Sequence, residues 1–463
     1  MTNRRRRAAI AALAALMAVT CAGLAPTRVS ASPATATIQS ASNAYVYGAA
    51  PVAMVRTRSQ LLCPRGPLRP APNQLINVPI AANPLIRVVV APNSDTLYTT
   101  AFLDLRDGPV TLSYPNTGGR YLVLQLLDMY TDVIGNVGTR TTGPGPASVT
   151  VVPPGYTGQI PAGSQRMQST TWDVWLLGRI LIAGGGFPIA QQVQAGIGLT
   201  VGPRQGYPAV VPPRLRTPAC TGRSPQNLAV DGPVFFDELA DVLVANPPPA
   251  RDASAVAGLA AVGVTPGSTP SRGPTANLLD RAIPLGERKI QAAVAGNLAR
   301  RDSWSSLATA GHYGTDYATR AAVARWGLGA NVEAESRYFL AATDGSGARL
   351  DGSRSYRLHL PARRPLVPVD PGDGGWWSVT MYDDANFLVP NLIGRYSLGP
   401  EASALTRNPD GSVDIVLSSR PPDDPRLLPN WLPAPAGTFR LIFRQYVPTS
   451  TTWFPSSPQV SDR

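Results

Sequence analysis

Proline is the residue that most limits how this chain can fold. The 463 residues include 48 prolines, about twice the usual frequency. Because proline lacks a backbone N–H and has a fixed φ, it breaks helix interiors and is excluded from central strands. The sequence therefore predicts many short strands joined by turns rather than a mostly helical protein.

Length and composition indicate a globular protein of two or three domains. Hydrophobic residues make up 44% of the chain, which is enough to fill that many cores. Charged residues make up only 15%, which excludes a long disordered polyelectrolyte.

The net charge of +12 does not indicate a nucleic-acid partner. Residues 1–31 hold five arginines and no acidic residue, so the chain from Ser32 onward keeps +7 of this charge. The remaining arginines are scattered, whereas nucleic-acid binders concentrate basic residues in a stripe with aromatic platforms. We therefore expect no nucleic-acid partner.

Residues 1–31 read as a signal peptide. Four arginines, Arg4 to Arg7, precede an apolar run from Ala8 to Ala25, and Val29-Ser30-Ala31 supplies a small-residue cleavage pattern. We expect cleaved export, a secreted or extracytoplasmic location and only transient membrane contact. The apolar run of 18 residues is at the lower limit for a membrane span, so anchoring by an uncleaved helix is the alternative.

Two cysteines, Cys63 and Cys220, remain after the leader. In an oxidising compartment they can form a disulfide bond, or they can stay as two separate thiols. Their spacing leaves both alternatives open.

The mature chain reads as β, then α, then β. A helix fits Ile38 to Leu62, and strand patterns then dominate to about residue 215. Helical patterns begin near residue 225, and strand patterns return from about 335. We predict an N-terminal β domain at 32–224, a helical connecting region at 225–334 and a C-terminal β domain at 335–463. The fold class is mainly β with a helical insert (α+β), and strands at this spacing are typical of a sandwich or a barrel.

The clearest statements about chemistry are exclusions. Lys289 is the only lysine and does not lie in a phosphate-binding loop motif, and no nucleophile-elbow motif occurs. Two histidines cannot form a three-histidine zinc site. His312 reads as a turn residue and His359 as one side of a strand. We expect no cofactor and no metal.

Acidic residues and tyrosines are the remaining candidates for catalysis. Asp95 precedes a predicted strand, and Asp128, Tyr130 and Asp132 occupy alternate positions in another segment. An extended strand would place these three on one face. Convergent carboxyl groups act as acid and base in glycoside cleavage, but aspartates at strand ends also cap turns. For this set of aspartates both interpretations stay open.

Aromatic residues in the C-terminal domain are candidates for ligand binding. Trp377 and Tyr382 could line a groove that stacks on a sugar, although such residues more often form the core of a β-sandwich. Trp376 precedes Trp377 directly, so their side chains point to opposite faces of a strand.

Several segments resemble a known two-domain family. Ala44-Tyr45-Val46-Tyr47-Gly48, Pro92-Asn93-Ser94-Asp95-Thr96-Leu97-Tyr98 and the segment from Arg120 to Thr142 are similar to its first domain, and Trp377-Ser378-Val379-Thr380-Met381-Tyr382-Asp383 and Asn391…Arg395-Tyr396-Ser397 to its second. The family carries domains of unknown function 1254 and 1214. The resemblance implies two jelly-roll-like β-sandwich domains with a helical insert, export and a homo-oligomer such as a trimer. It implies no established reaction.

The sequence supports two hypotheses about function. The first is an exported, non-catalytic binding or structural module of the cell envelope or exterior, with a small molecule or a protein as its partner. The alternative is a hydrolase or lyase acting on a carbohydrate or another small polar substrate, with Asp128 or Asp132 as base, Asp95 as its partner and Tyr130 or Arg140 as an orienting group.

This alternative requires the three carboxyl groups to lie within about 12 Å of one another. The candidate ligand-binding residues are Tyr98, Arg140, Trp377, Tyr382, Asp383 and Arg395.

Overall fold

The computed structural model describes residues 36–64, 68–85, 91–182, 186–307, 309–400 and 405–461. The predicted signal peptide lies outside these residues. From Thr37 onward the chain forms one compact unit. Its described part contains four β-sheets and several α-helices, which confirms the mixed α+β fold class.

Two sheets form what we call the first β unit, residues 76–201. One sheet has the order β1-β2-β8-β4-β5 and the other has the order β7-β6-β3-β9. Both sheets contribute aliphatic side chains to one core, among them Leu124 and Leu176 from the first sheet and Leu112 and Val151 from the second. The strands are β1 (Ile76–Val78), β2 (Thr96–Asp104), β3 (Val110–Tyr114), β4 (Leu122–Asp128), β5 (Val133–Gly138), β6 (Ala147–Val152), β7 (Gln165–Gln168), β8 (Asp173–Leu181) and β9 (Gly198–Val201), with helices α3 (Thr139–Thr142) and α4 (Gly186–Ala195).

Strand β8 is the centre of the five-stranded sheet. It pairs antiparallel with β2 on one side and with β4 on the other. All nine of its residues are buried, so side chains on both of its faces are covered. A strand covered on both faces reads as a continuous apolar run rather than an alternating one.

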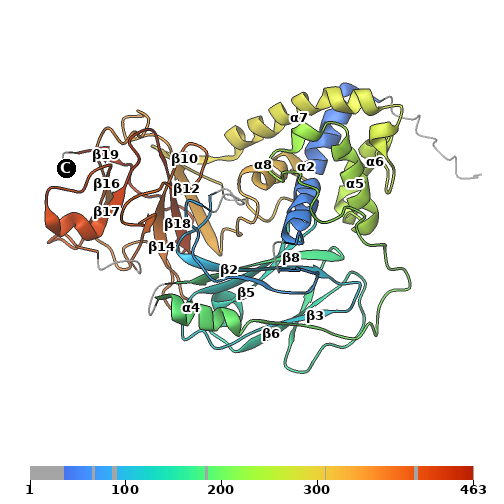
Figure 1. Cartoon of the computed structure of the whole chain (residues 1–463), viewed down its shortest axis with the longest axis horizontal. Coiled ribbons are helices and arrows are strands. Elements are labelled where there is room, and N and C mark those ends of the chain that lie inside the picture. The colour runs from blue at the N-terminus through green and yellow to red at the C-terminus, as the bar shows by residue number, and fades with distance from the viewer. Residues whose placement is uncertain are drawn as a thin grey trace, which may run out of the picture. The chain divides into compact units, whose positions relative to one another are not determined.

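The helical layer combines the first described helix with helices that come much later in the chain. The five helices are α2 (Ile38–Leu61), α5 (Val234–Ala245), α6 (Ala253–Ala261), α7 (Ala276–Asn297) and α8 (Tyr317–Trp326), and α2 contacts each of the other four (Figure 1). Helix α2 is buried on almost every side, because small residues allow its neighbours to approach closely. A Cβ atom on Gly48 would lie 2.7 Å from Leu239 of α5.

Two further sheets form the second β unit, residues 299–460. Their strand orders are β10-β11-β12-β18-β14-β15 and β17-β16-β13-β19, and they share one core. The strands are β10 (Ala299–Arg301), β11 (Trp304–Ser306), β12 (Ser336–Ala341), β13 (Tyr356–Leu360), β14 (Trp377–Tyr382), β15 (Ser397–Leu398), β16 (Val413–Ser418), β17 (Trp431–Pro433), β18 (Arg440–Tyr446) and β19 (Gln459–Val460). Short 3₁₀ helices cover Leu228–Asp231, Ala250–Asp252, Pro270–Arg272 and Pro425–Asn430.

Within the described residues, none of the helices combines the length and the apolar composition that a membrane span requires.

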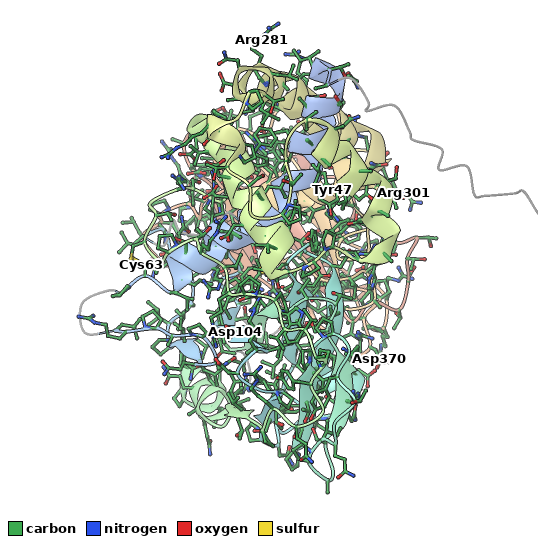
Figure 2. The ribbon with its side chains drawn as sticks, turned by 90° about the vertical axis from the view of Figure 1, so that its right-hand side faces the viewer. Tyr47, Cys63, Asp104, Arg281, Arg301 and Asp370 are labelled. Carbon is green, nitrogen blue, oxygen red and sulfur yellow. A yellow bond between two sulfur atoms is a disulfide. The ribbon has the colours of Figure 1, made fainter. Side chains whose placement is uncertain are left out.

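A disulfide bond joins Cys63 to Cys220, with 4.8 Å between their Cα atoms. Cys63 follows the end of α2 (Figure 2), and Cys220 lies in the segment between β9 and α5. The backbone N–H of Cys220 also donates to the carbonyl oxygen of Ser59 on α2. The bond therefore fastens the segment that leads from the first β unit back to the helical layer.

Replacing both Cys63 and Cys220 with serine should lower the free energy of unfolding by about 2–5 kcal/mol, because the disulfide closes a long loop in the unfolded chain. The two cysteines are 157 residues apart in sequence. Urea denaturation measures the change. Dithiothreitol should destabilise the wild type and leave the double variant unchanged, whereas equal stability of the two oxidised proteins would contradict the expectation.

Candidate functional site

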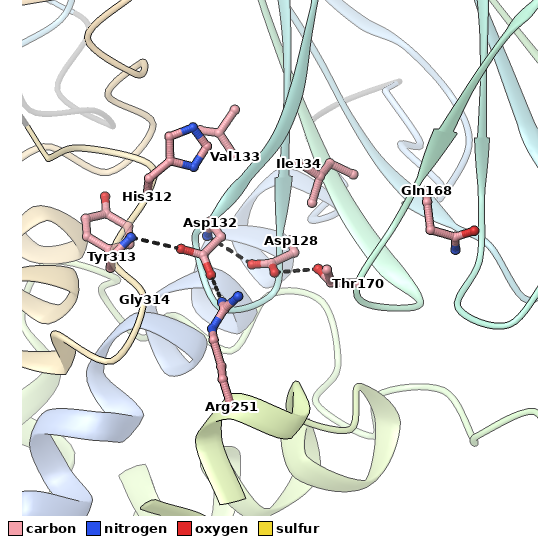
Figure 3. A pocket seen from close by; sticks show the side chains of 10 residues that line it. All are labelled: Asp128, Asp132, Val133, Ile134, Gln168, Thr170, Arg251, His312, Tyr313 and Gly314. Atoms are coloured by element: carbon pink, nitrogen blue, oxygen red, sulfur yellow. Dashed lines mark hydrogen bonds and ion pairs between the residues drawn. The ribbon is translucent and has the colours of Figure 1, made fainter.

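A cavity of about 310 Å³ opens beside the turn that connects β4 to β5 (Figure 3). The first β unit, the 3₁₀ helix before α6 and the loop before α8 all contribute to its walls. The lining residues are Asp128, Asp132, Val133, Ile134, Gln168, Thr170, Arg251, His312, Tyr313 and Gly314.

The carboxylate of Asp128 shapes this turn. Strand β4 ends at Asp128, whose Oδ1 accepts hydrogen bonds from the backbone N–H groups of Tyr130 (2.8 Å) and Asp132 (3.0 Å). Thr131 has a positive φ of 68°, which an extended strand does not allow. The expectation that residues 128–132 continue as a strand, with alternate residues on one face, was therefore wrong. The aspartate satisfies turn N–H groups instead.

Tyr130 consequently points away from the cavity. Its side chain is fully buried, and its hydroxyl donates to the carbonyl oxygen of Asn246 at 2.8 Å. The guanidinium carbon of Arg320 lies 5.6 Å from the ring centroid. Tyr130 therefore belongs to the contact with the helical layer.

Burial and the neighbouring charge of Asp132 raise the pKa of Asp128 to about 6. Hydrogen bonds oppose this rise, including one that Thr170 donates to Oδ2 at 2.6 Å. Both carboxylate oxygens of Asp128 therefore already accept hydrogen bonds from the protein.

Asp132 is paired as well. Its carboxylate forms an ion pair with Arg251 and accepts a long hydrogen bond from the backbone N–H of Tyr313 at 3.4 Å. His312, Gln168 and Thr170 are exposed around the cavity. The open part of the site thus offers hydrogen-bonding groups, whereas its carboxylates are held by the protein.

Asp95 lies at the other end of the same sheet. Asp128 is opposite Val174 of β8, whereas Thr96, next to Asp95, is opposite Leu181. Seven residues of strand separate these two positions, which corresponds to ~23 Å at ~3.3 Å per residue. The hypothesis that Asp95 joins Asp128 and Asp132 in one catalytic set was therefore wrong.

Asp95 lies where the two β units meet. Its Oδ1 accepts a hydrogen bond from Ser397 of the second β unit, and its Oδ2 is buried without a hydrogen-bond partner. Burial raises the pKa of this carboxyl group. Two candidate ligand-binding residues lie nearby: the Tyr98 hydroxyl accepts from the Asn93 N–H at 3.1 Å, and the Tyr382 hydroxyl donates to the Pro92 carbonyl oxygen at 2.6 Å.

The two consecutive tryptophans do point to opposite faces. Trp377 stacks on Phe443 in the core of the second β unit, with 5.3 Å between ring centroids. Trp376 stacks on Tyr446 at 4.1 Å, in a cluster that also contains Tyr121 of the first β unit. Both tryptophans are 3% exposed, so neither forms the wall of an open sugar groove.

The other three candidate ligand-binding residues have structural contacts. Asp383 accepts hydrogen bonds from the N–H groups of two residues in the turn that follows it. Arg395 donates to two backbone carbonyl oxygens, those of Leu428 and Trp431. Arg140 pairs with the buried carboxylate of Glu335 at 2.6 Å and so links the two β units.

Sequence reasoning missed Arg251, Thr170 and Gln168 as cavity residues. They come from segments more than 80 residues apart in sequence, and no short motif joins them. The pairing of Arg251 with Asp132 depends on how the helical layer packs on the first β unit. Within the described residues, no group of three His, Cys, Asp or Glu side chains is placed to hold a metal ion.

Residues 72–201 match the family model described as "Protein of unknown function (DUF1254)". Residues 335–450 match the model described as "Protein of unknown function (DUF1214)". The chain carries both domains, in this order. The DUF1254 domain contains Asp95, Asp128 and Asp132, and the DUF1214 domain contains β12, β14 and β18.

One solved structure shares the fold over nearly the whole chain. The VPA0106 protein from Vibrio parahaemolyticus has a TM-score of 0.66 and 20% sequence identity, and the match covers 92% of this chain and 100% of that one. An uncharacterised protein from Burkholderia cenocepacia matches with a TM-score of 0.43 and 12% identity, over 90% of this chain and 88% of that one. No curated protein matches the sequence.

Replacing Asp128 with asparagine should remove a stability cost that grows with pH. The ordinary pKa of 3.8 rises to about 6 in the folded protein, so the folded state favours the neutral carboxyl group. The free energy of unfolding of the wild type should therefore fall by about 3 kcal/mol relative to that of D128N as the pH rises from about 4 to about 7. Urea denaturation of both proteins across this range measures the difference.

Asp410 provides a control of opposite sign. A hydrogen bond from Ser412 lowers the pKa of this exposed carboxyl group, so the folded state favours its charged form. D410N should lose stability relative to the wild type as the pH rises to about 4 from below, and the difference should then stay constant up to about pH 7. A stability difference between D128N and the wild type that does not change with pH would contradict the assignment for Asp128.

Proposed function

We propose that this protein is an exported binding module that holds a small polar ligand in the cavity beside the β4–β5 turn. One observation carries the proposal: the two cavity carboxylates are already occupied by protein donors, while His312 is exposed. Gln168 and Thr170 are also exposed, and because their donors are used within the protein, their side-chain oxygens serve as acceptors. Such an arrangement supplies hydrogen bonds to a ligand without a carboxylate that is free to attack it.

The geometry also favours a ligand class. Arg251 is neutralised by Asp132, so the cavity offers no uncompensated charge at that pair. The oxygens of Gln168 and Thr170 accept hydrogen bonds from neutral hydroxyl groups, and the imidazole of His312 donates one and accepts one. We therefore propose a neutral hydroxylated ligand, such as a monosaccharide or a polyol.

Export is part of the same proposal. The predicted signal peptide supports it, and so does the disulfide bond between Cys63 and Cys220, because such bonds persist in oxidising compartments. The resemblance to the DUF1254 and DUF1214 family supports two finer proposals, a jelly-roll-like strand order and a homo-oligomer such as a trimer. Light scattering of the purified protein measures the oligomeric state.

The second candidate function is hydrolysis or elimination with Asp128 as a general acid or base. A pKa of about 6 suits proton transfer near neutral pH, which favours this candidate. Asp128 would first have to release Thr170, its partner on Oδ2. Turnover of a sugar substrate that is lost in D128N would support this candidate over simple binding.

Neutral monosaccharides and polyols should raise the melting temperature of the wild type and leave that of Arg251→Gln unchanged. Without Arg251, Asp132 loses its ion pair and the cavity wall loses its fixed position. A ligand at about one hundred times its dissociation constant stabilises the folded state by about 2.7 kcal/mol, which a thermal melt detects.

Arg349→Gln is the matched control. Arg349 is also an exposed arginine in an ion pair, with Asp384, but it lies in the second β unit. R349Q should keep the full ligand-induced shift. Equal shifts in R251Q and the wild type would place ligand binding outside this cavity.

A further inference from the structure

Six arginines of the described part of the chain are buried: Arg56, Arg106, Arg179, Arg320, Arg337 and Arg444. Four of them have a carboxylate oxygen within 4 Å. Arg56 pairs with Asp231 and Glu238, and Arg106 pairs with Asp104 and Asp173. Arg320 pairs with Asp252, and Arg337 pairs with Glu333. Arg179 and Arg444 are the two for which the described residues supply no such carboxylate. Buried arginines are rare unless they are paired, so both require an explanation.

The two arginines lie in the same contact region, where the two β units meet. Arg179 is on β8 and Arg444 is on β18. The guanidinium carbon of Arg179 lies 5.8 Å from the ring centroid of Tyr98. From Tyr98 a chain of hydrogen bonds runs through Asn93 to Tyr446, two residues after Arg444.

Both guanidinium groups have only neutral hydrogen-bond partners. Arg179 donates to the side-chain oxygen of Gln125 (3.0 Å) and to the carbonyl oxygen of Gly329 (2.7 Å). Arg444 donates to a threonine hydroxyl, a tyrosine hydroxyl and a backbone carbonyl oxygen, those of Thr380, Tyr382 and Ala91. These partners satisfy N–H groups but carry no negative charge themselves, and a buried positive charge without a negative partner is costly inside a protein.

Two carboxylates lie in this region, Glu335 and Asp95, and they do not neutralise both arginines. Glu335 is paired with Arg140. Asp95 accepts its hydrogen bond from Ser397, and the positive charge of Arg444 acts to lower the pKa of Asp95. Even a fully charged Asp95 would leave one positive charge in excess. The side-chain amide of Asn331, two residues after Gly329, is also 1% exposed, and neither its nitrogen nor its oxygen has a hydrogen-bond partner.

Less buried residues surround this contact region. Ser94, Tyr98 and Tyr338 are partly exposed, whereas Arg179 and Arg444 behind them are 8% and 3% exposed. Guanidinium groups pair with carboxylate and phosphate in the same way, through two parallel N–H donors.

We propose that this contact region, defined by Arg179, Arg444, Tyr98 and Asn331, is a second binding site that takes the carboxylate or phosphate group of a small anionic ligand. The site differs from the cavity beside Asp128 in place and in charge. A bound anion supplies the negative charge that the buried arginines lack and contacts both β units.

Isothermal titration of the purified protein with sodium phosphate and with sodium acetate, at constant ionic strength in chloride, tests the proposal. At least one anion should bind saturably, and the one that binds more tightly identifies the ligand group as phosphate or carboxylate. R179Q and R444Q should each raise the dissociation constant at least tenfold. R426Q, which removes an exposed arginine paired with Asp424, should bind as the wild type does.

Two conservative changes keep the test decisive if a glutamine variant does not fold. D95N removes the nearest carboxylate charge, so it should bind the anion at least as tightly as the wild type. R444K and R179K keep the charge but lose the paired donors, so they should weaken binding. No saturable binding by the wild type, unchanged binding in the arginine variants, or a tenfold weaker D95N would each overturn the proposal.

Discussion

The position of β8 is the constraint on which the arrangement of polar groups in the first β unit depends. This strand lies between β2 and β4 and is buried at every residue. Polar side chains are costly along such a strand unless they find partners. Most of them therefore collect at its two ends, where the sheet meets other parts of the chain. The Val174 end meets the helical layer, and the Leu181 end meets the second β unit.

Each end shows how aspartates act in this fold. At the Val174 end, the carboxylate oxygens of Asp128 accept hydrogen bonds from turn N–H groups and from Thr170. At the Leu181 end, Asp95 accepts from Ser397 across the contact between the β units. Glu335 strengthens that contact by accepting from Tyr121 at 2.8 Å and from Arg140 at 2.6 Å. In each case the carboxylate stabilises local structure through its hydrogen bonds, so its oxygens are already engaged before any ligand binds.

Local sequence patterns located several elements. The expected helix from Ile38 to Leu62 corresponds to α2, and helices α5 to α8 lie in sequence between most strands of the first β unit and most strands of the second. The same patterns could not place Asp95 relative to Asp128, because β8 enters between β2 and β4 from about 45 residues later in the chain. The alternation of residues 128–132 also predicted that the strand continues beyond Asp128. Alternation does not detect that the Asp128 side chain accepts hydrogen bonds from the turn that follows it.

Arg179 shows a signal that sequence reasoning could have used. It interrupts an apolar run that begins at Val174 in the sequence. An arginine within an apolar strand pattern indicates a buried positive charge, and a buried charge requires a partner. The strand patterns of β8 and β18 each contain one arginine of this kind, Arg179 and Arg444. Only the packing of the two β units shows that both lie in one contact region and that no carboxylate of the described residues forms an ion pair with either.

Anomalous diffraction from crystals grown with selenate is a direct test of an anion site at Arg179 and Arg444, because selenate is a phosphate-like oxyanion with a strong anomalous signal. We expect a selenium peak within hydrogen-bonding distance of the guanidinium groups of Arg179 and Arg444 and no peak beside Asp128. A selenium peak in the Asp128 cavity with none at the two arginines, or an Asp95 carboxylate paired directly with both arginines, would contradict this expectation.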